Sequence, residues 1–276
     1  MKIGLALSGG GALGAAHIGV LEELEAHNIV VARICGTSAG AIVGLLYASG
    51  GLKAITRFYE EIEKAGLFNR STIVLHRNST IFKKVHEALR HCVKEESFGQ
   101  LKTKFSCVAT NLTSGEPIIL NSGDPVNAVM ASSAYPGVFP VQKIGFNYLI
   151  DGGLTHNLPA SVLREKGYDF VIGSSLYSVA KFEKFDSGGN PKTNPLGVAL
   201  RSLDIIQKGL AEYEISNCDF CFQPEVHSFS WYNFDQIAEI KNVGKKHAEA
   251  AVVDLIAELA KRGHPKSFWQ KLFNGE

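Results

Sequence analysis

The sequence predicts an α/β protein built on a mainly parallel sheet, and two observations near its start carry this prediction. A short, continuous apolar run at residues 3–7 is typical of a strand buried in a parallel sheet, and glycines and a helical pattern of apolar residues follow it. The same order of strand, glycine turn and helix recurs at residues 29–49. Two such units in succession predict parallel strands joined by helices.

The later segments extend this pattern. Helices are predicted at residues 58–67, 81–92, 126–134, 196–215 and 235–261, and strands at residues 104–109, 117–120, 146–150, 169–174 and 218–222. Residues 186–195, where Gly, Asn and Pro cluster, are predicted to form a surface loop. Because no repeat, low-complexity tract or linker divides the chain, we expect residues 1–276 to form a single domain.

The composition limits the classes of function. The chain has 28 Lys and Arg residues against 27 Asp and Glu, a net charge of +1, so it offers no basic surface of the kind that binds nucleic acid. The apolar run at the start is too short for a signal peptide, and the longest apolar stretch, residues 39–48, is too short to span a membrane. We therefore expect a cytoplasmic protein that does not bind nucleic acid.

The five cysteines are an odd number and are spread widely along the chain. This pattern is typical of free thiols in a reducing compartment rather than of a disulfide framework. Cys218 and Cys221 have the spacing of metal ligands, but they have no second pair nearby. We interpret them as buried thiols in a strand and expect no metal site.

The most specific motif is Gly36-Thr37-Ser38-Ala39-Gly40, a G-x-S-x-G sequence between a predicted strand and a predicted helix. Such a turn lifts a serine hydroxyl clear of the sheet, and it needs glycines because larger residues two positions before and after the serine would clash. Ser38 is therefore a candidate nucleophile, and the N–H of Ala39 can help to stabilise an oxyanion. The alternative is an ordinary serine in a turn.

A glycine-rich turn follows the first strand. Gly9, Gly11 and Gly14 fit the spacing of a dinucleotide-binding loop, but that fingerprint also needs an acidic residue at the end of the next strand, where residues 34–37 carry none. The alternative is an oxyanion loop, in which bare backbone such as the N–H groups of Gly10 and Gly11 points at a developing negative charge. We favour the oxyanion loop, since both glycine turns are expected at the same carboxyl edge of the sheet.

A serine nucleophile needs a base, and the residues alone leave two kinds of candidate. Asp151 ends a predicted strand and is followed by two glycines, which would expose a carboxylate at the sheet edge. A carboxylate can act as the base where burial keeps its pKa from falling too low. His156 and His227 lie in turn-rich segments and are the histidine candidates, whereas His17 lies inside the first predicted helix and the others resemble ordinary helix or surface residues.

Four ordered blocks of the sequence resemble the patatin-like phospholipases. They are Gly-Gly-Gly-Ala-Leu-Gly at residues 9–14, Gly-Thr-Ser-Ala-Gly at 36–40, Ala-Ser-Ser-Ala-Tyr-Pro-Gly-Val-Phe-Pro at 131–140 and Asp-Gly-Gly at 151–153. The motif-bearing part covers residues 3–175, and residues 176–276 are expected to complete the sheet and helices. Four blocks in this order are far more specific than any one of them.

This resemblance implies a lipid acyl hydrolase with a three-layer α/β/α fold. Ser38 would be the nucleophile and Asp151 its base, without a histidine, a metal or a cofactor. The expected substrate is a lipid or another ester, reached through transient contact with a membrane surface, and the sequence carries no signal for an oligomeric state. The residues expected to form the oxyanion hole are Gly9, Gly10, Gly11 and Ala39, and those expected to shape the motifs are Gly14, Gly36, Gly40, Gly152 and Gly153.

One position departs from the family pattern, because Leu13 stands where the family usually carries Arg or Lys. This departure leaves a non-catalytic lipid-binding or regulatory protein on the same scaffold as an alternative. Further alternatives are an acyltransferase and a Ser–His–Asp hydrolase.

Two clusters of aromatic residues have two interpretations each. The cluster Phe229, Trp231, Tyr232 and Phe234 would line an acyl-chain channel or pack in the core. The segment at residues 261–273, which mixes aromatic and basic residues, would rest on a membrane surface or dock on its own domain.

Overall fold

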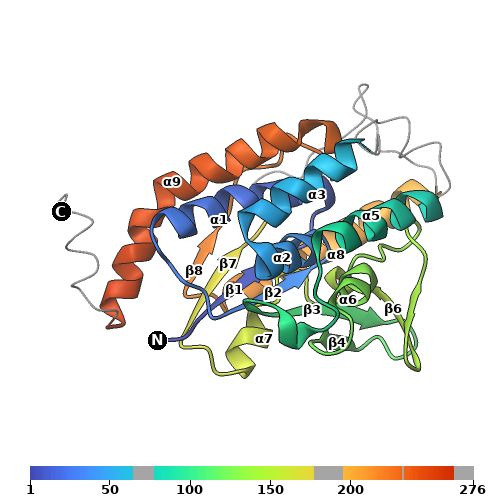
Figure 1. Cartoon of the computed structure of the whole chain (residues 1–276), viewed down its shortest axis with the longest axis horizontal. Helices are drawn as coiled ribbons and strands as arrows, with labels where there is room; N and C mark the ends of the chain where they lie inside the picture. The colour runs from blue at the N-terminus through green and yellow to red at the C-terminus, as the bar shows by residue number, and fades with distance from the viewer. Residues whose placement is uncertain (65–77, 177–194, 232, 264–276) are drawn as a thin grey trace.

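A twisted sheet of eight strands forms the centre of the computed structural model, which describes residues 1–64, 78–176, 195–231 and 233–263 (Figure 1). Seven of these strands lie in the order β5-β6-β3-β2-β1-β7-β8, and β4 pairs with β3 off this path. Their bounds are β1 Ile3–Leu7, β2 Arg33–Thr37, β3 Lys104–Asn111, β4 Pro117–Leu120, β5 Gln142–Ile144, β6 Asn147–Asp151, β7 Phe170–Ser174 and β8 Phe220–Phe222.

The sheet is parallel in its middle and antiparallel at one end. Strands β3, β2, β1, β7 and β8 run parallel to one another, whereas β4 and β6 pair antiparallel with β3, and β5 with β6. Every residue of β1 and β7 is buried, as expected for strands covered on both faces.

Helices cover both faces of the sheet, which confirms the predicted three-layer α/β/α fold. Leu5 and Leu7 point into a large core shared with helices α1, α2, α3, α5 and α9, while Ala6 between them points into a second core with α7 and α8. This alternation is the period of two of a β-strand. The helices are α1 Ala16–Ala26, α2 Ala39–Gly50, α3 Leu52–Lys64, α5 Asn78–Cys92, α6 Pro125–Ser132, α7 Ala160–Glu165, α8 Pro195–Ile215 and α9 Ile237–Lys261.

Several element boundaries differ from the sequence-based expectation. The strand expected at residues 29–35 is shorter, because Ile29 and Val31 enter the core from an irregular segment before β2 begins at Arg33. The helix expected at residues 58–67 begins earlier, at Leu52, directly after Gly51 in a left-handed conformation. The loop expected at residues 186–195 lies almost entirely outside the described residues. That the whole chain forms one domain stays a prediction.

The cysteines are free. Cys35, Cys92 and Cys107 are buried. Cys221 in β8 and Cys218, two residues before this strand, are only half-buried, so the prediction of two buried thiols in one strand is wrong. Among the described residues no group of His, Cys, Asp or Glu side chains has the arrangement of a metal site. In the same part of the chain, no helix has both the length and the apolar character needed to cross a bilayer.

His17 lies inside the first helix, as predicted, and is a buried structural residue of the core. Its Nδ1 lies 2.8 Å from the hydroxyl of Ser174, and its Nε2 lies 2.9 Å from the carbonyl of Ser8. Because a carbonyl can only accept, Nε2 carries the proton and Nδ1 accepts from the Ser174 hydroxyl. The imidazole therefore ties helix α1 to the carboxyl ends of β1 and β7, and burial lowers its pKa to about 4.

This depressed pKa predicts that His17 makes the fold sensitive to acid. The unfolded chain takes up a proton near pH 6.5 and the folded one only near pH 4, so stability is lost as the pH falls between these values. We expect His17 to account for about 2 kcal/mol of the fall in unfolding free energy between pH 7.5 and pH 5. In urea titrations, the unfolding free energy of His17→Gln should fall by about 2 kcal/mol less over this pH range than that of the wild type. His227→Gln is the control, since His227 is exposed, and its unfolding free energy should fall as far as that of the wild type. Equal pH dependence in both variants would contradict the assignment.

Candidate active site

Ser38 lies on a strained turn between β2 and α2. Its backbone has φ 51° and ψ −119°, a conformation that residues with a side chain rarely adopt. The two motif glycines allow this turn to pack closely. A Cβ on Gly36 would lie 2.4 Å from the carbonyl oxygen of Gly40, and a Cβ on Gly40 would lie 2.3 Å from the carbonyl oxygen of Leu7. The turn therefore presses against the end of the neighbouring strand β1.

The backbone around Ser38 is held by Ser132. The N–H of Ser38 donates to the Ser132 hydroxyl at 3.0 Å, and that hydroxyl donates to the carbonyl of Val108 in β3 at 2.5 Å. The N–H of Ser38 is thereby occupied. Ala39 is the first residue of α2, and its N–H is one of the four amide groups at the start of a helix that have no partner within it.

The glycine-rich loop lies beside this turn. Gly10 and Gly11 have φ values of 155° and 58°, and a Cβ on Gly11 would lie 2.4 Å from the carbonyl oxygen of Trp231. Gly14 lets the short helix after the loop approach the serine turn, because a Cβ there would lie 2.7 Å from the Cβ of Ala39. The two glycine turns therefore meet at one edge of the sheet, as the sequence predicted.

The N–H of Gly9 is already bound. It donates to the backbone carbonyl of Asn157 and to its side-chain Oδ1, both at 3.1 Å. Gly9 therefore anchors the loop through Asn157, which the sequence did not single out. The N–H groups of Gly10 and Gly11 are the better candidates for binding an oxyanion.

Asp151 brings a buried carboxyl group to the same place. It ends β6, opposite Ala109 of β3, and its side chain is completely buried. Its Oδ1 accepts from the N–H of Gly153 at 2.7 Å, while Oδ2 is buried without a regular hydrogen bond. Gly152 is required here because a Cβ would lie 2.1 Å from the carbonyl oxygen of Val108.

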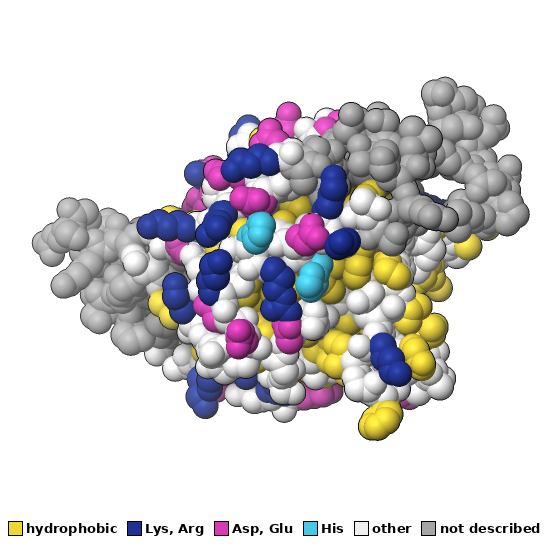
Figure 2. Space-filling model, turned by 45° about the vertical axis from the view of Figure 1, so that its right-hand side comes forward, with side chains coloured by type: hydrophobic (Ala, Val, Ile, Leu, Met, Phe, Trp, Pro, Cys, Tyr) yellow, Lys and Arg dark blue, Asp and Glu magenta, His cyan; other side chains and the backbone are white. Residues whose placement is uncertain are grey.

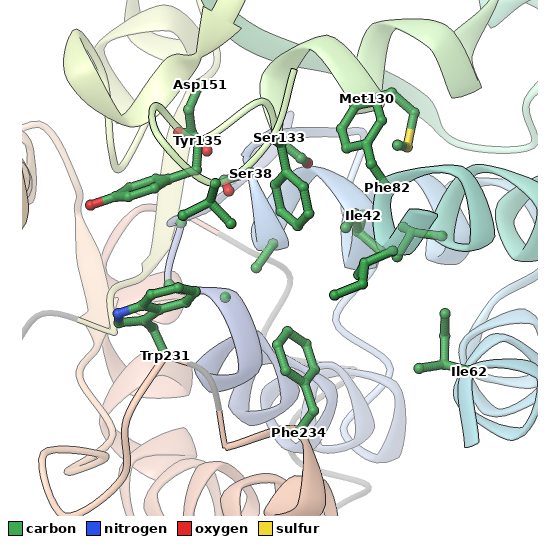
Figure 3. A pocket seen from close by; sticks show the side chains of 18 of the residues that line it. Ser38, Ile42, Ile62, Phe82, Met130, Ser133, Tyr135, Asp151, Trp231 and Phe234 are labelled. Atoms are coloured by element: carbon green, nitrogen blue, oxygen red, sulfur yellow. The ribbon is translucent and has the colours of Figure 1, made fainter. Parts of the chain in front are cut away.

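The environment of Asp151 raises its pKa to about 6. Burial is the dominant cause, because it disfavours the charged form. The neighbouring Ser38 hydroxyl and the N–H of Gly153 act in the opposite direction by stabilising the carboxylate. The Ser38 hydroxyl is thus close enough to influence the carboxyl, and both side chains line the same cavity (Figure 3).

That cavity is largely apolar and has a volume of about 150 Å³. Ser38 lies between two different walls in Figure 3, with Tyr135 and Trp231 on one side and an apolar wall on the other. Helices α2, α3, α5 and α6 supply most of the apolar wall, which includes Ile42, Phe58, Ile62, Ile81, Phe82, Val85 and Met130. The space beyond Ser38 therefore suits a hydrocarbon chain.

The opposite wall contains a polar group that sequence analysis missed. The hydroxyl of Tyr135 donates to Asp204 of α8 at 3.0 Å, and the Tyr135 ring stacks on Trp231 with centroids 6.0 Å apart. Burial raises the pKa of Asp204, against the effect of the Tyr135 hydrogen bond and of the nearby Arg201. No motif marks Asp204, since it lies in an ordinary helical sequence far along the chain from Ser38.

The aromatic cluster near residue 231 was expected either to line a channel or to pack in the core, and its members do both. Trp231 and Phe234 line the cavity, whereas Phe229 packs against the large core. Tyr232 and residues 264–273 of the C-terminal segment lie outside the described residues.

The two candidate histidines do not line the cavity in the described structure. Nε2 of His156 lies 3.8 Å from the carboxylate of Glu214, and its backbone carbonyl accepts from the Thr37 hydroxyl at 2.7 Å. His227 is exposed. Of the candidate bases, only Asp151 lines the cavity with Ser38.

Leu13 is buried in the large core and does not line the cavity. Its side chain therefore contributes to the packing of the core.

The strain at Ser38 predicts an unusual order of stability. Ser38→Gly and Ser38→Ala both remove the hydroxyl, but only glycine adopts this backbone conformation without cost. After allowing for the greater freedom of glycine in the unfolded chain, we expect Ser38→Gly to be more stable than Ser38→Ala by about 1 kcal/mol in chemical denaturation. At Ser49, inside α2, we expect the opposite result, with Ser49→Ala more stable than Ser49→Gly, because alanine favours the helix interior. Greater stability of Ser38→Ala would mean that the turn is not strained.

Comparison with known proteins places the chain in a family. The model of the patatin-like phospholipases matches residues 5–164. A patatin-like phospholipase domain-containing protein of Caenorhabditis elegans is 28% identical over 92% of this chain and 21% of its own length. A lysophospholipase of Meyerozyma guilliermondii is 30% identical over 64% of this chain and 13% of its own length.

Among solved structures, VipD of Legionella pneumophila is similar to this chain. The match covers 87% of this chain and 66% of the VipD chain, with 14% sequence identity and a TM-score of 0.47. The chain spans only a minor part of the two relatives that it matches in sequence. Because the family model matches more than half of the 276 residues, the chain belongs to the patatin-like phospholipase family.

Proposed function

We propose that this protein is a serine lipid acyl hydrolase that cleaves carboxylic esters of lipids through Ser38 and Asp151. The observation that carries the proposal is the pairing of a strained serine at the start of a helix with a buried carboxyl group at the wall of an apolar cavity. The family and the relative named as a lysophospholipase support the class of substrate.

The first half of the reaction would form an acyl-enzyme. Asp151 accepts the proton of the Ser38 hydroxyl as Oγ attacks the ester carbonyl carbon. The negative charge that develops on the carbonyl oxygen is stabilised by the N–H groups of Gly10, Gly11 and Ala39. The tetrahedral intermediate then expels the alcohol, which takes the proton from Asp151.

The second half would release the acid. Water enters the place of the alcohol, and Asp151 removes its proton as the water oxygen attacks the acyl carbon. Ser38 leaves with that proton restored, and the fatty acid departs. Both halves use the same base and the same N–H groups, so no second titrating residue is needed.

The elevated pKa of Asp151 makes an aspartate suitable for this role. A carboxylate with its usual pKa near 4 is a weak base, whereas one with a pKa of about 6 is largely ionised at pH 7 and accepts a proton more readily. The same burial that raises the pKa also excludes water from the carboxyl, which strengthens its interaction with the Ser38 hydroxyl.

Nucleophile labelling tests the proposal. We expect a fluorophosphonate to modify Ser38 alone, as located by peptide mass spectrometry, and Ser38→Ala to lower kcat/KM for a soluble nitrophenyl ester by at least about 10⁴-fold. Ser133→Ala is the matched control, because Ser133 lines the same cavity and its hydroxyl is buried without a hydrogen bond. It should change the rate by less than about threefold. Hydrolysis by Ser38→Ala at the wild-type rate would exclude Ser38 as the nucleophile.

The pH dependence tests the base. Because Asp151 must be ionised, kcat/KM should fall tenfold per pH unit below about pH 6 and level off above it. Asp204→Asn should retain this inflection, although Asp204 lines the same cavity and also has a raised pKa. Asp151→Asn should abolish activity at every pH. An inflection that disappears in His156→Ala would instead identify a histidine base.

A further inference from the structure

An apolar face on the β5–β6 hairpin is not explained by the fold. In the sheet register Lys143 lies opposite Tyr148, and the N–H of Leu112, just beyond β3, donates to the carbonyl of Tyr148. Leu112 and Tyr148 therefore share one face of the sheet, and the period of two along β5 adds Val141 to it. All three are about half exposed, at 53%, 49% and 46% respectively.

The turn of this hairpin carries a completely exposed phenylalanine. Phe146 has 100% relative exposure, and it follows Gly145, whose φ of 60° forms the turn. Phe146 is the second residue of this turn, directly before Asn147, where β6 begins, so it lies at the tip of the hairpin. We call Leu112, Val141, Phe146 and Tyr148 the hairpin patch. Figure 2 shows hydrophobic side chains gathered on the side of the molecule where α6 and β6 lie.

The sheet register places the hairpin patch at the same edge as the active site. Thr37, which precedes Ser38, lies opposite Val108, and β3 continues for three residues beyond it to Asn111. Asn111 lies opposite Leu149, and β6 extends from there, away from the sheet, to the turn at Phe146. At about 3.3 Å per residue, the turn lies on the order of 20 Å beyond Ser38 along the strand direction.

The patch is also continuous with the cavity wall. Val138 and Phe139 line the cavity, and the chain runs directly from them through residue 140 to Val141. Phe139 packs on Phe82 of the apolar wall, with ring centroids 5.2 Å apart. A molecule held at the hairpin patch would therefore face the wall that leads toward Ser38.

The chemistry of the patch indicates a lipid surface as its partner. The four side chains of the patch are uncharged, and one basic side chain adjoins them, because Lys143 lies over the Tyr148 ring at 5.6 Å. The four side chains offer on the order of 400–500 Å² if an aromatic side chain contributes 150–250 Å². A standard protein interface takes about 800 Å² from each partner, which makes a stable second subunit a poor fit.

We propose that the hairpin patch inserts into the interfacial region of a lipid bilayer and holds the active-site edge of the sheet against it. This inference rests on the proposed lipid substrate for its purpose, but membrane binding does not require hydrolysis. Phe146 and Tyr148 enter the boundary between head groups and acyl chains, and Lys143 stays at the head-group level. Because the four side chains of the patch are uncharged, we expect binding to depend little on salt.

Partition into vesicles tests this proposal without turnover. Ether-linked phosphatidylcholine vesicles present a bilayer without ester bonds, and flotation measures the bound fraction. We expect Phe146→Ala to lower the partition coefficient at least about tenfold, at low and high salt alike. Val30→Ala is the matched control, since Val30 is 79% exposed but precedes β2 at the opposite edge of the sheet. It should bind as the wild type does.

A direct probe uses tryptophan at the same two positions. Phe146→Trp should show a blue shift of its fluorescence on adding vesicles, and Val30→Trp should not. All variants should hydrolyse a soluble nitrophenyl ester at the wild-type rate. If that hydrolysis is absent in every variant while Phe146→Ala still loses vesicle binding, the proposed function fails and this inference stands.

Several results would overturn the inference. The inference is wrong if Phe146→Ala binds vesicles as well as the wild type does. It is also wrong if the wild-type protein does not bind vesicles. Equal loss of vesicle binding and of soluble ester hydrolysis would mean that Phe146 supports the active site instead. A dimer seen by light scattering that dissociates in Phe146→Ala would assign the patch to a second copy of the chain.

Discussion

The burial of one carboxyl group beside one hydroxyl is the constraint on which the candidate site depends. Keeping Asp151 ionised at neutral pH against a pKa of about 6 costs the folded state about 3 kcal/mol relative to an exposed aspartate. This cost is what remains after the N–H of Gly153 and the Ser38 hydroxyl have stabilised the carboxylate, and Oδ2 is buried without a regular hydrogen bond. A carboxyl group with a raised pKa, as the proposed reaction needs, is thus obtained at the expense of stability.

The mixed sheet is what brings the two groups together. In a purely parallel sheet the carboxyl ends of the strands carry the site, and Ser38 follows this rule at the end of β2. Asp151 also ends its strand, but β6 runs antiparallel to β3 and pairs Asp151 with Ala109 in the interior of that strand. The Asp151 carboxyl consequently sits inside the edge of the sheet and is buried, whereas a residue at the end of a parallel strand would be more open to solvent. Ser132 connects the serine turn with β3, because its hydroxyl accepts from the N–H of Ser38 and donates to the carbonyl of Val108.

The sequence was informative where local chemistry requires a particular residue. Gly36, Gly40 and Gly152 stand where a Cβ would collide with backbone, so their spacing predicts turns that the structure contains. Sequence analysis failed where a role depends on packing between distant segments. Asp204 and Asn157 have no local signature, and His17 resembles any helical histidine until β1 and β7 close around it. Burial of Asp151, and hence its pKa, also follows only from the register of β6.

The same antiparallel end of the sheet connects the cavity with the hairpin patch. Strand β6 begins at the exposed turn beside Phe146 and ends at the buried Asp151, so five residues lead from the surface to the candidate base. Strands β1 and β2 end near the level of Ser38, because each turns there into a helix that covers the sheet. An antiparallel pair has no such limit and can continue as a two-stranded ribbon. The departure from parallel pairing therefore buries the carboxyl at one end of β6 and exposes an apolar turn at the other.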